Sequence, residues 1–290
     1  MTHIYVTPDD RLQKVFDGAA PGSVIHLSAG VYRQKVMIHT PNLTILGAGA
    51  GKTRIVFDDY ARKRDDQGFE YITFRTYTVA VCADGIQMRD LSIINDAGKP
   101  EEKGQQVALS VLGTDFAMTD CVLTSTQDTL FLGPLPPDLI ERYEGFLPDA
   151  LRRGGEMVQH FQNCTIEGTV DFIFGCGNAR FTDCVIRSLA DARNVGYVAA
   201  PSHSADQTEG FHFLQCSLTA VDGVAPGSIY LARPWRDYGL ARFEDCNIGC
   251  HIAHAGFDKW SGTNRDRTAR FFESPAVPGR VSWINRKETT

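Results

Sequence analysis

Hydrophobic and polar residues follow one short pattern at seven places in this sequence: a polar residue, Leu or Cys, any residue, and then Ile or Leu. The seven copies open at Asn42, Asp90, Asp120, Asn163, Asp183, Gln215 and Asp245. Apolar residues two positions apart indicate a half-buried strand. The strand recurs at intervals of 20 to 48 residues. Such a repeat predicts coils stacked along one axis, because each unit buries its apolar face only against its neighbours.

The segments between these strands are rich in Gly and Asp, which favours an all-β fold, a single-domain parallel β-helix over residues 1–290. Near the start, Thr7 is a candidate helix cap, and apolar residues follow at helical spacing from Leu12. We expect a short capping helix over residues 7–20, because the open end of a strand stack needs cover. The Pro-rich stretch 133–156 predicts a loop insertion from one coil.

Composition narrows the classes of protein further. Of the 290 residues, 43% are hydrophobic, but no run of about 18 apolar residues predicts a membrane span. A net charge of -6 argues against nucleic acid as a partner. The segment from Met1 to Val6 lacks the basic stretch and apolar region of a secretory signal. We therefore expect a cytoplasmic monomer, or a secreted one if a leader has been removed, that binds neither nucleic acid nor membrane.

Cysteine is frequent and regularly placed. Five of the eight cysteines occupy the second position of the repeated pattern: Cys121, Cys164, Cys184, Cys216 and Cys246. Equivalent positions of successive coils should stack inside the core, where free Cys behaves as a small hydrophobic residue. Disulfides or a metal site are the alternatives, but no C-x-x-C pair is present. We predict no metal site.

The repeat also shows which acidic residues occupy equivalent positions on neighbouring coils. Asp128 and Asp171 each lie eight residues after the start of a repeat, on consecutive coils once the insertion is left out. Neighbouring strands are about 4.8 Å apart, so the two carboxyl groups should stand side by side. Asp191 has the same offset, but Ala, Arg and Asn around it indicate a solvated loop.

Two adjacent carboxyl groups cannot both ionise easily in a partly dry groove. One should be protonated near neutral pH and the other charged, which suits one acid and one nucleophile or base. The alternative is structural, since aspartates also cap turns by accepting hydrogen bonds from the backbone.

Five segments resemble the pectin methylesterases (pectinesterases), in particular the bacterial type. They are Gln105-Gln106-Val107-Ala108-Leu109, Gln127-Asp128-Thr129-Leu130-Phe131, Val170-Asp171-Phe172-Ile173-Phe174-Gly175, Gly196-Tyr197-Val198-Ala199-Ala200-Pro201 and Leu231-Ala232-Arg233-Pro234-Trp235. The similarity extends from about Val6 to Trp260, nearly the whole chain.

The resemblance implies a right-handed parallel β-helix and a carboxylic ester hydrolase without a cofactor. Its substrate would be methyl-esterified pectin or oligogalacturonides, from which it releases methanol. Carried over motif by motif, Asp171 would be the nucleophile and Asp128 the general acid and then base. Gln105 and Gln127 would donate hydrogen bonds to the oxyanion, and Arg233 would orient Asp171 and keep it charged.

The resemblance also suggests which residues bind the sugar chain. Trp235 and Phe172 would line the groove, and Thr76, Tyr197 and Phe131 lie in segments that would contact substrate. The insertion follows Asp128 closely, so we expect it to wall the groove and restrict the substrate to short or end-bound oligomers.

Two other functions stay open on the sequence. A polysaccharide lyase or galacturonan hydrolase could use the same scaffold, but a lyase would need a calcium-binding acid cluster. A non-catalytic carbohydrate-binding β-helix would need no reacting side chains, whereas all five expected ones are present.

Overall fold

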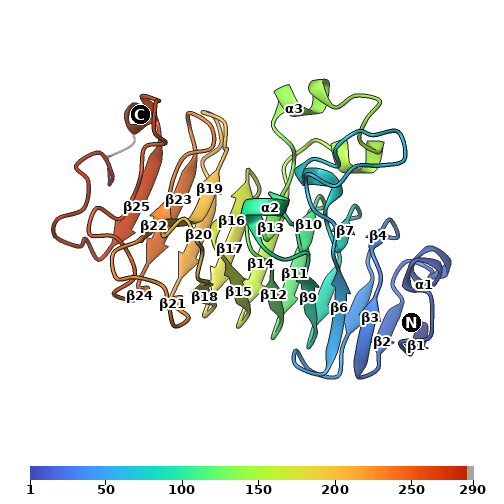
Figure 1. Cartoon of the computed structure of the whole chain (residues 1–290). Coiled ribbons are helices and arrows are strands. Elements are labelled where there is room, and N and C mark those ends of the chain that lie inside the picture. Colours follow the sequence, from blue (N-terminus) through green and yellow to red (C-terminus); the bar gives the residue numbers. More distant parts are fainter. Residues whose placement is uncertain (286–290) are drawn as a thin grey trace.

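In the computed structural model, which describes residues 1–285, parallel strands wind into a three-sided coil, a parallel β-helix (Figure 1). The ten-stranded sheet runs through β1 (His3–Val6), β2 (Val24–Leu27), β5 (Thr44–Leu46), β8 (Gln87–Arg89), β11 (Phe116–Thr119), β14 (Val158–Gln162), β17 (Asn178–Thr182), β20 (Phe211–Leu214), β23 (Leu240–Glu244) and β25 (Arg270–Ser274). The eight-stranded sheet runs through β3 (Gly30–Arg33), β6 (Thr53–Phe57), β9 (Ser92–Asn95), β12 (Val122–Thr124), β15 (Thr165–Gly168), β18 (Val185–Ser188), β21 (Ser217–Ala220) and β24 (Asn247–Ile248). The seven-stranded sheet runs through β4 (Val36–Ile38), β7 (Val79–Val81), β10 (Leu109–Val111), β13 (Leu130–Leu132), β16 (Val170–Gly175), β19 (Gly196–Pro201) and β22 (Ile229–Ala232). The predicted all-β parallel β-helix is confirmed.

Six of the seven copies of the repeated pattern lie at the corner where the ten-stranded sheet gives way to the eight-stranded sheet, whereas the Asn42 copy lies between β4 and β5, at the corner where the seven-stranded sheet gives way to the ten-stranded sheet. The opening residue of the pattern has a positive φ in all seven copies, between 51° and 59°. Side chains rarely adopt this left-handed conformation, and Asn and Asp tolerate it best among non-glycine residues. The corner therefore explains why six of the seven copies begin with Asn or Asp.

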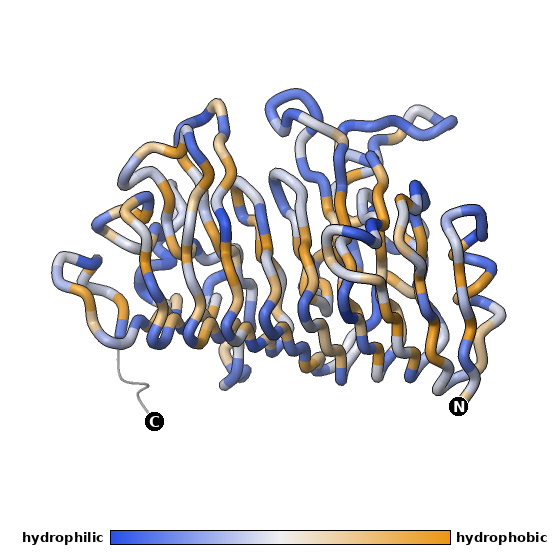
Figure 2. Tube along the Cα trace, turned by 90° about the horizontal axis from the view of Figure 1, so that it is seen from below, coloured by the Kyte–Doolittle hydropathy of each residue, from blue (hydrophilic) through white to orange (hydrophobic). Residues whose placement is uncertain are grey.

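The interior is built from ladders of like residues. Cys121, Cys164, Cys184 and Cys216 are buried at successive corners, as predicted, whereas the fifth, Cys246, is only half-buried; all five are free thiols. A second ladder stacks phenylalanine rings with centroids 4.5 to 4.9 Å apart; its members are Phe161, Phe181, Phe213 and Phe243. Figure 2 shows the result as hydrophobic segments that recur from coil to coil. Stacked side chains of this kind fix the register of the coils.

The helix at the start of the chain is shorter than predicted. Helix α1 spans Leu12–Gly18, with Leu12 and Phe16 buried against the end of the coil stack (Figure 1). The expectation that it begins at Thr7 is wrong. The Asp10 carboxylate accepts hydrogen bonds from the backbone N–H and the hydroxyl of Thr7, at 2.8 and 2.9 Å, and so closes a turn before the helix.

Residues 133–157 leave the coil between β13 and β14 and rise above the seven-stranded sheet (Figure 1). This insertion holds helix α3 (Pro137–Arg142) and the 3₁₀ helix η2 (Asp149–Arg152). Its leucines pack in a second apolar cluster with Phe74, from the 3₁₀ helix η1 (Thr73–Arg75). A further excursion carries the four-residue helix α2 (Pro100–Lys103), and η3 (Arg265–Arg267) lies near the other end. Within residues 1–285, no helix has the length and apolarity needed to cross a membrane.

Candidate active site

Asp128 and Asp171 lie at matching positions of adjacent strands in the seven-stranded sheet. Strands β13 and β16 pair in parallel with Leu130 opposite Ile173, which sets Asp128 opposite Asp171. The backbone N–H of Asp128 donates to the carbonyl of Val170 at 3.1 Å. Both aspartates line one pocket, and both are 8% exposed. The two carboxyl groups therefore share one poorly solvated surface.

The backbone at both aspartates departs from regular strand geometry. Asp128 has φ 65° and Asp171 has φ 50°. The pairing of β16 with β19 shifts register between Val170 and Ile173, as in a β-bulge. A bulge re-aims a side chain that would otherwise follow the alternation of the strand. Residues before and after Asp171 can thus stay in the core while its carboxylate reaches the pocket.

A guanidinium group holds Asp171. Arg233 follows β22, and its Nε and Nη2 donate to the two carboxylate oxygens of Asp171 at 2.8 and 2.6 Å. The guanidinium carbon lies 3.7 Å from the ring centroid of Tyr197 and 4.0 Å from that of Trp260. A two-pronged ion pair between aromatic faces fixes both the position and the charge of the carboxylate.

The two carboxyl groups differ in environment. Burial raises the pKa of Asp128 well above its ordinary value, and the nearby charge of Asp171 raises it further. Burial also raises the pKa of Asp171, but the hydrogen bonds and charge of Arg233 oppose that rise. The proton shared by such a pair therefore resides on Asp128, and Asp171 is the group kept ionised.

Side-chain amides stand beside the acid pair. Gln105 and Gln127 both line the pocket. The Oε1 of Gln127 accepts a hydrogen bond from Arg193 Nη1 at 2.9 Å. With the carbonyl oxygen of the amide engaged in this way, the Nε2 donor of Gln127 faces the pocket side, where it hydrogen-bonds the Asp128 carboxyl group.

Arg193 is held by Asp191, which the sequence analysis placed in a solvated loop. The segment is indeed a loop, with Ala192, Arg193 and Asn194 exposed, but the Asp191 side chain itself is only 4% exposed. Its two oxygens accept from Arg193 Nε and Nη2 at 2.7 and 2.5 Å. The offset that Asp191 shares with the two pocket aspartates was the signal for an ordered position, and the polar neighbours obscured it.

The pocket has a volume of about 380 Å³. It lies over the seven-stranded sheet, and eight separate segments of the chain contribute to it. Its lining residues are Thr73, Phe74, Gln105, Gln127, Asp128, Leu139, Arg142, Tyr143, Asp171, Phe174, Ala200, Arg233, Trp235, Arg236 and Trp260. Residues 1–285 contain no group of three or more His, Cys, Asp or Glu side chains placed to hold a metal ion.

Of the five residues expected to bind sugar, Trp235 lines the pocket. Phe172 does not, because it is fully buried in the main core. Tyr197 is half-buried and packs beneath the guanidinium of Arg233, where it supports the site without lining it. The expectation for Phe172 is wrong, and Phe174 lines the pocket in its place. The bulge at Asp171 determines which of these two rings faces the pocket.

Thr76 and Phe131 are also buried structural residues and do not reach the pocket. Thr76 is 0% exposed; its hydroxyl donates to the carbonyl of Thr73 and accepts from the N–H of Val107, at 2.7 and 2.9 Å. Phe131 is 1% exposed and packs with its centroid 5.1 Å from that of Phe74. Both residues support segments that line the pocket, so the similarity of their neighbourhoods to a binding site was misleading.

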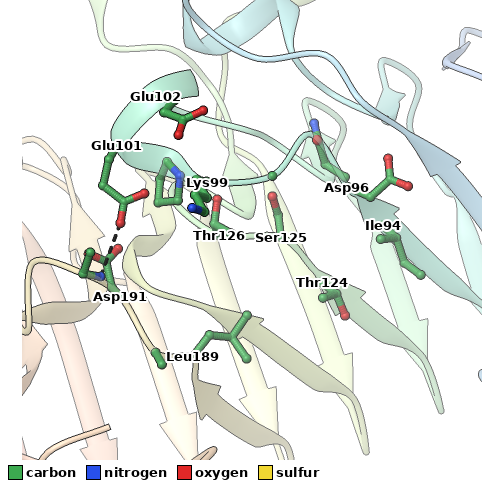
Figure 3. Close-up of a pocket in the computed structure, with 15 residues that line it drawn as sticks. Ile94, Asp96, Lys99, Glu101, Glu102, Thr124, Ser125, Thr126, Leu189 and Asp191 are labelled. Atoms are coloured by element: carbon green, nitrogen blue, oxygen red, sulfur yellow. Dashed lines mark hydrogen bonds between the residues drawn. The ribbon is translucent and has the colours of Figure 1, made fainter. Parts of the chain in front are cut away.

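A larger pocket of about 720 Å³ lies under helix α2 and against the eight-stranded sheet (Figure 3). Its lining includes Asp191 but neither of the paired aspartates nor either glutamine. Figure 3 shows Glu101 reaching from α2 toward the Asp191 loop, where its Oε1 accepts from the N–H of Ala192 at 3.3 Å. Because the paired aspartates, both glutamines and Arg233 all line the smaller pocket, we place the chemistry there. The cavity matters because its wall anchors the loop that holds Arg193.

A protein-family comparison matches residues 2–133 and 149–287 to the family described as Pectinesterase. "Pectinesterase QRT1" of Arabidopsis thaliana is 29% identical over 295 residues, which cover 96% of this chain and 69% of that protein. "Probable pectinesterase/pectinesterase inhibitor 35" of the same plant is 30% identical over 270 residues, covering 90% and 44%. The chain thus spans less than half of the second relative.

Solved structures agree with the fold. "Pectin methylesterase from Carrot" superposes with a TM-score of 0.80 at 27% identity, over 100% of this chain and 90% of that one. A pectin methylesterase mutant in complex with hexasaccharide IV superposes with a TM-score of 0.78 at 25% identity, over 93% and 87%. The hexasaccharide shows that a protein of this fold binds an oligosaccharide.

Proposed function

Because this chain belongs to the pectinesterase family, we propose that it hydrolyses the methyl esters of galacturonate residues in pectin or oligogalacturonides and releases methanol. The observation that carries this proposal is the ion pair of Arg233 with Asp171 beside Asp128, whose pKa is raised, in one pocket. This arrangement provides an ionised carboxylate and a protonated carboxyl group at adjacent positions. Ester hydrolysis needs such a nucleophile and such an acid.

The proposed reaction has two stages. An oxygen of Asp171 attacks the ester carbonyl carbon, the bond to the methoxy oxygen breaks, and Asp128 gives its proton to the departing methanol. Asp128 then takes a proton from water as the water attacks the resulting acyl group. Asp171 is released as a carboxylate, the galacturonate leaves as a free acid, and Asp128 is protonated again.

The developing oxyanion needs donors, because a carboxylate is a weak nucleophile toward an ester. Gln105 and Gln127 are the amides available in the pocket. Donors aimed at an oxyanion contribute roughly 3 to 4 kcal/mol each in typical hydrolases. The hydrogen bond from Arg193 to Gln127 Oε1 supports this role, since it orients the amide with its donor toward the substrate.

Methanol release is the direct test of this function. We expect the protein to liberate methanol from methylated trigalacturonate and from pectin without added metal. An unsaturated product, or loss of activity with a chelator, would favour a lyase instead. Binding of the oligomer without any methanol would leave the non-catalytic carbohydrate-binding β-helix as the better account.

The insertion at residues 133–157 should limit which substrates reach the site. Leu139 and Tyr143 from this insertion line the pocket, and Asp138 pairs with Arg236 across it at 2.9 Å. A long chain must pass this wall, whereas a short chain or a chain end need not. We expect kcat/KM per ester to be at least about tenfold higher for methylated trigalacturonate than for polymeric pectin. Equal values for the two substrates would contradict the restriction.

Three properties stay predictions. The chain resembles plant and bacterial structures alike, and its assignment to the bacterial type rests on the sequence motifs. The monomeric state and the cytoplasmic location, where imported and partly methylated oligomers would be the substrate, are likewise proposed from the sequence.

A further inference from the structure

One cation of the pocket is not used by the proposed chemistry. Arg142, at the end of helix α3, lines the pocket and is exposed. Its guanidinium forms no hydrogen bond or ion pair with any residue from 1 to 285. The other two arginines of the pocket are engaged, Arg233 with Asp171 and Arg236 with Asp138. Arg142 therefore presents an unpaired guanidinium to whatever occupies the groove.

The segment that carries Arg142 is held in place on both sides. Arg236 Nη2 donates to the two carboxylate oxygens of Asp138 at 3.2 and 2.9 Å, which ties α3 to the far wall of the pocket. On the near side, Leu139 is 4% exposed, and the ring of Tyr143 lies 6.1 Å from that of Phe74. The backbone before Arg142 is thus fixed, and the guanidinium can act as a positioned group.

This segment is an addition to the family pattern. The family comparison matches the chain up to residue 133 and again from residue 149, so α3 and Arg142 fall between the matched parts. Arg142 is therefore a feature of this chain, and a role for it is not inherited from the family resemblance.

We infer that Arg142 binds the free carboxylate of a galacturonate unit next to the esterified unit, so that the enzyme prefers partly de-esterified oligomers. This inference rests on the proposed function. Each unit of the polymer carries either a neutral methyl ester or a carboxylate. A guanidinium binds a carboxylate through two charge-assisted hydrogen bonds but offers a methyl ester no such charge pairing.

The acid pair also discriminates between a methyl ester and a carboxylate, but it favours the ester. A carboxylate placed against Asp171 would meet a like charge, whereas the neutral ester meets none. The ester is thus directed to the acid pair and a neighbouring carboxylate to Arg142. Together the two sites set the register of the sugar chain in the groove.

The test compares two trigalacturonates: one methylated on the central unit only, and one methylated on all three units. For the wild type we expect kcat/KM per ester to be roughly three- to tenfold higher for the first, mainly through KM, since the contact is exposed to solvent. Arg142→Gln should abolish this preference, and Arg142→Lys should keep part of it. Arg180→Gln removes an exposed arginine of β17, on the ten-stranded sheet, and should leave the preference unchanged.

The outcomes separate cleanly. A wild-type enzyme that treats both substrates alike, or a preference that survives Arg142→Gln, would overturn the role of Arg142 while the esterase function stands. An equal loss of preference in Arg180→Gln would reduce the effect to overall charge and overturn it too. Absence of methanol from both substrates would instead refute the proposed function. Unfolding curves matching the wild type would show that the variants are folded.

Discussion

Replacement of Asp171 by Asn should lower kcat for methanol release by at least about 1,000-fold. Asn keeps the size of the side chain and tolerates the φ of 50° at this position, so the fold should be preserved. It lacks the ionised oxygen that would attack the ester. The measurement is methanol production from methylated trigalacturonate at saturating substrate, together with a thermal unfolding curve.

A matched control is available at another corner of the coil. Asp245 also has a positive φ, 51°, but lies outside the pocket. Asp245→Asn makes the same chemical change in the same backbone conformation and should leave kcat within about twofold of the wild type. If Asp171→Asn keeps more than about a tenth of the wild-type rate, Asp171 is not the nucleophile.

Replacement of Asp128 by Asn should remove activity and at the same time raise stability. The loss of the proton donor is expected to cost about 100- to 10,000-fold in kcat, because methoxide is a poor leaving group. The gain in stability follows from the burial of a titrating carboxyl group beside a second one. Active-site groups of this kind commonly reduce the free energy of unfolding.

The pH dependence of this gain has a definite sign. Because the pKa of Asp128 is raised in the folded protein, its stabilising contribution is complete below the unfolded pKa of about 3.9. The contribution is lost as the pH rises through the folded pKa. The amide introduced by Asp128→Asn does not titrate, so the difference in Tm between variant and wild type should grow from about pH 4 to about pH 8. A difference that is constant, or that shrinks with rising pH, would contradict the assignment.

The sequence predicted the coil and the meeting of the reacting groups because both follow from a regular repeat. The left-handed conformation at the corner favours Asn or Asp in most coils, and these residues can be recognised in the sequence. Counting from these corner residues places Asp128 and Asp171 on neighbouring strands. Local motifs supplied Arg233, whose pairing with Asp171 depends on strand order and hence on the same repeat.

Side-chain direction next to an irregularity could not be predicted in the same way. Phe172 and Phe174 are equally aromatic and both follow Asp171, yet one is in the core and the other lines the pocket. The bulge in β16 determines which of the two rings faces the pocket, and no residue type in the sequence indicates that bulge. Likewise, the burial of the Asp191 side chain could not be predicted, because its partner Arg193 connects to Gln127 through contacts between different coils.

The contributions of the insertion were also beyond the sequence alone. Its position beside Asp128 indicated a wall, but the Asp138–Arg236 pair joins residues almost a hundred positions apart. Neither residue belongs to a recognisable motif. Which side chain of the insertion stays unpaired, and thus available to a ligand, followed only from the arrangement of the whole pocket.

The insertion leaves after β13 of the seven-stranded sheet and returns at β14 of the ten-stranded sheet, and β13 still pairs directly with β16. The strand pairing that holds the reacting groups is thus complete without the excursion that carries Arg142. In evolution such an arrangement lets selectivity diversify by changes in one excursion, without disturbing the chemistry beneath it. A protein engineer could use the same independence by exchanging that excursion between relatives.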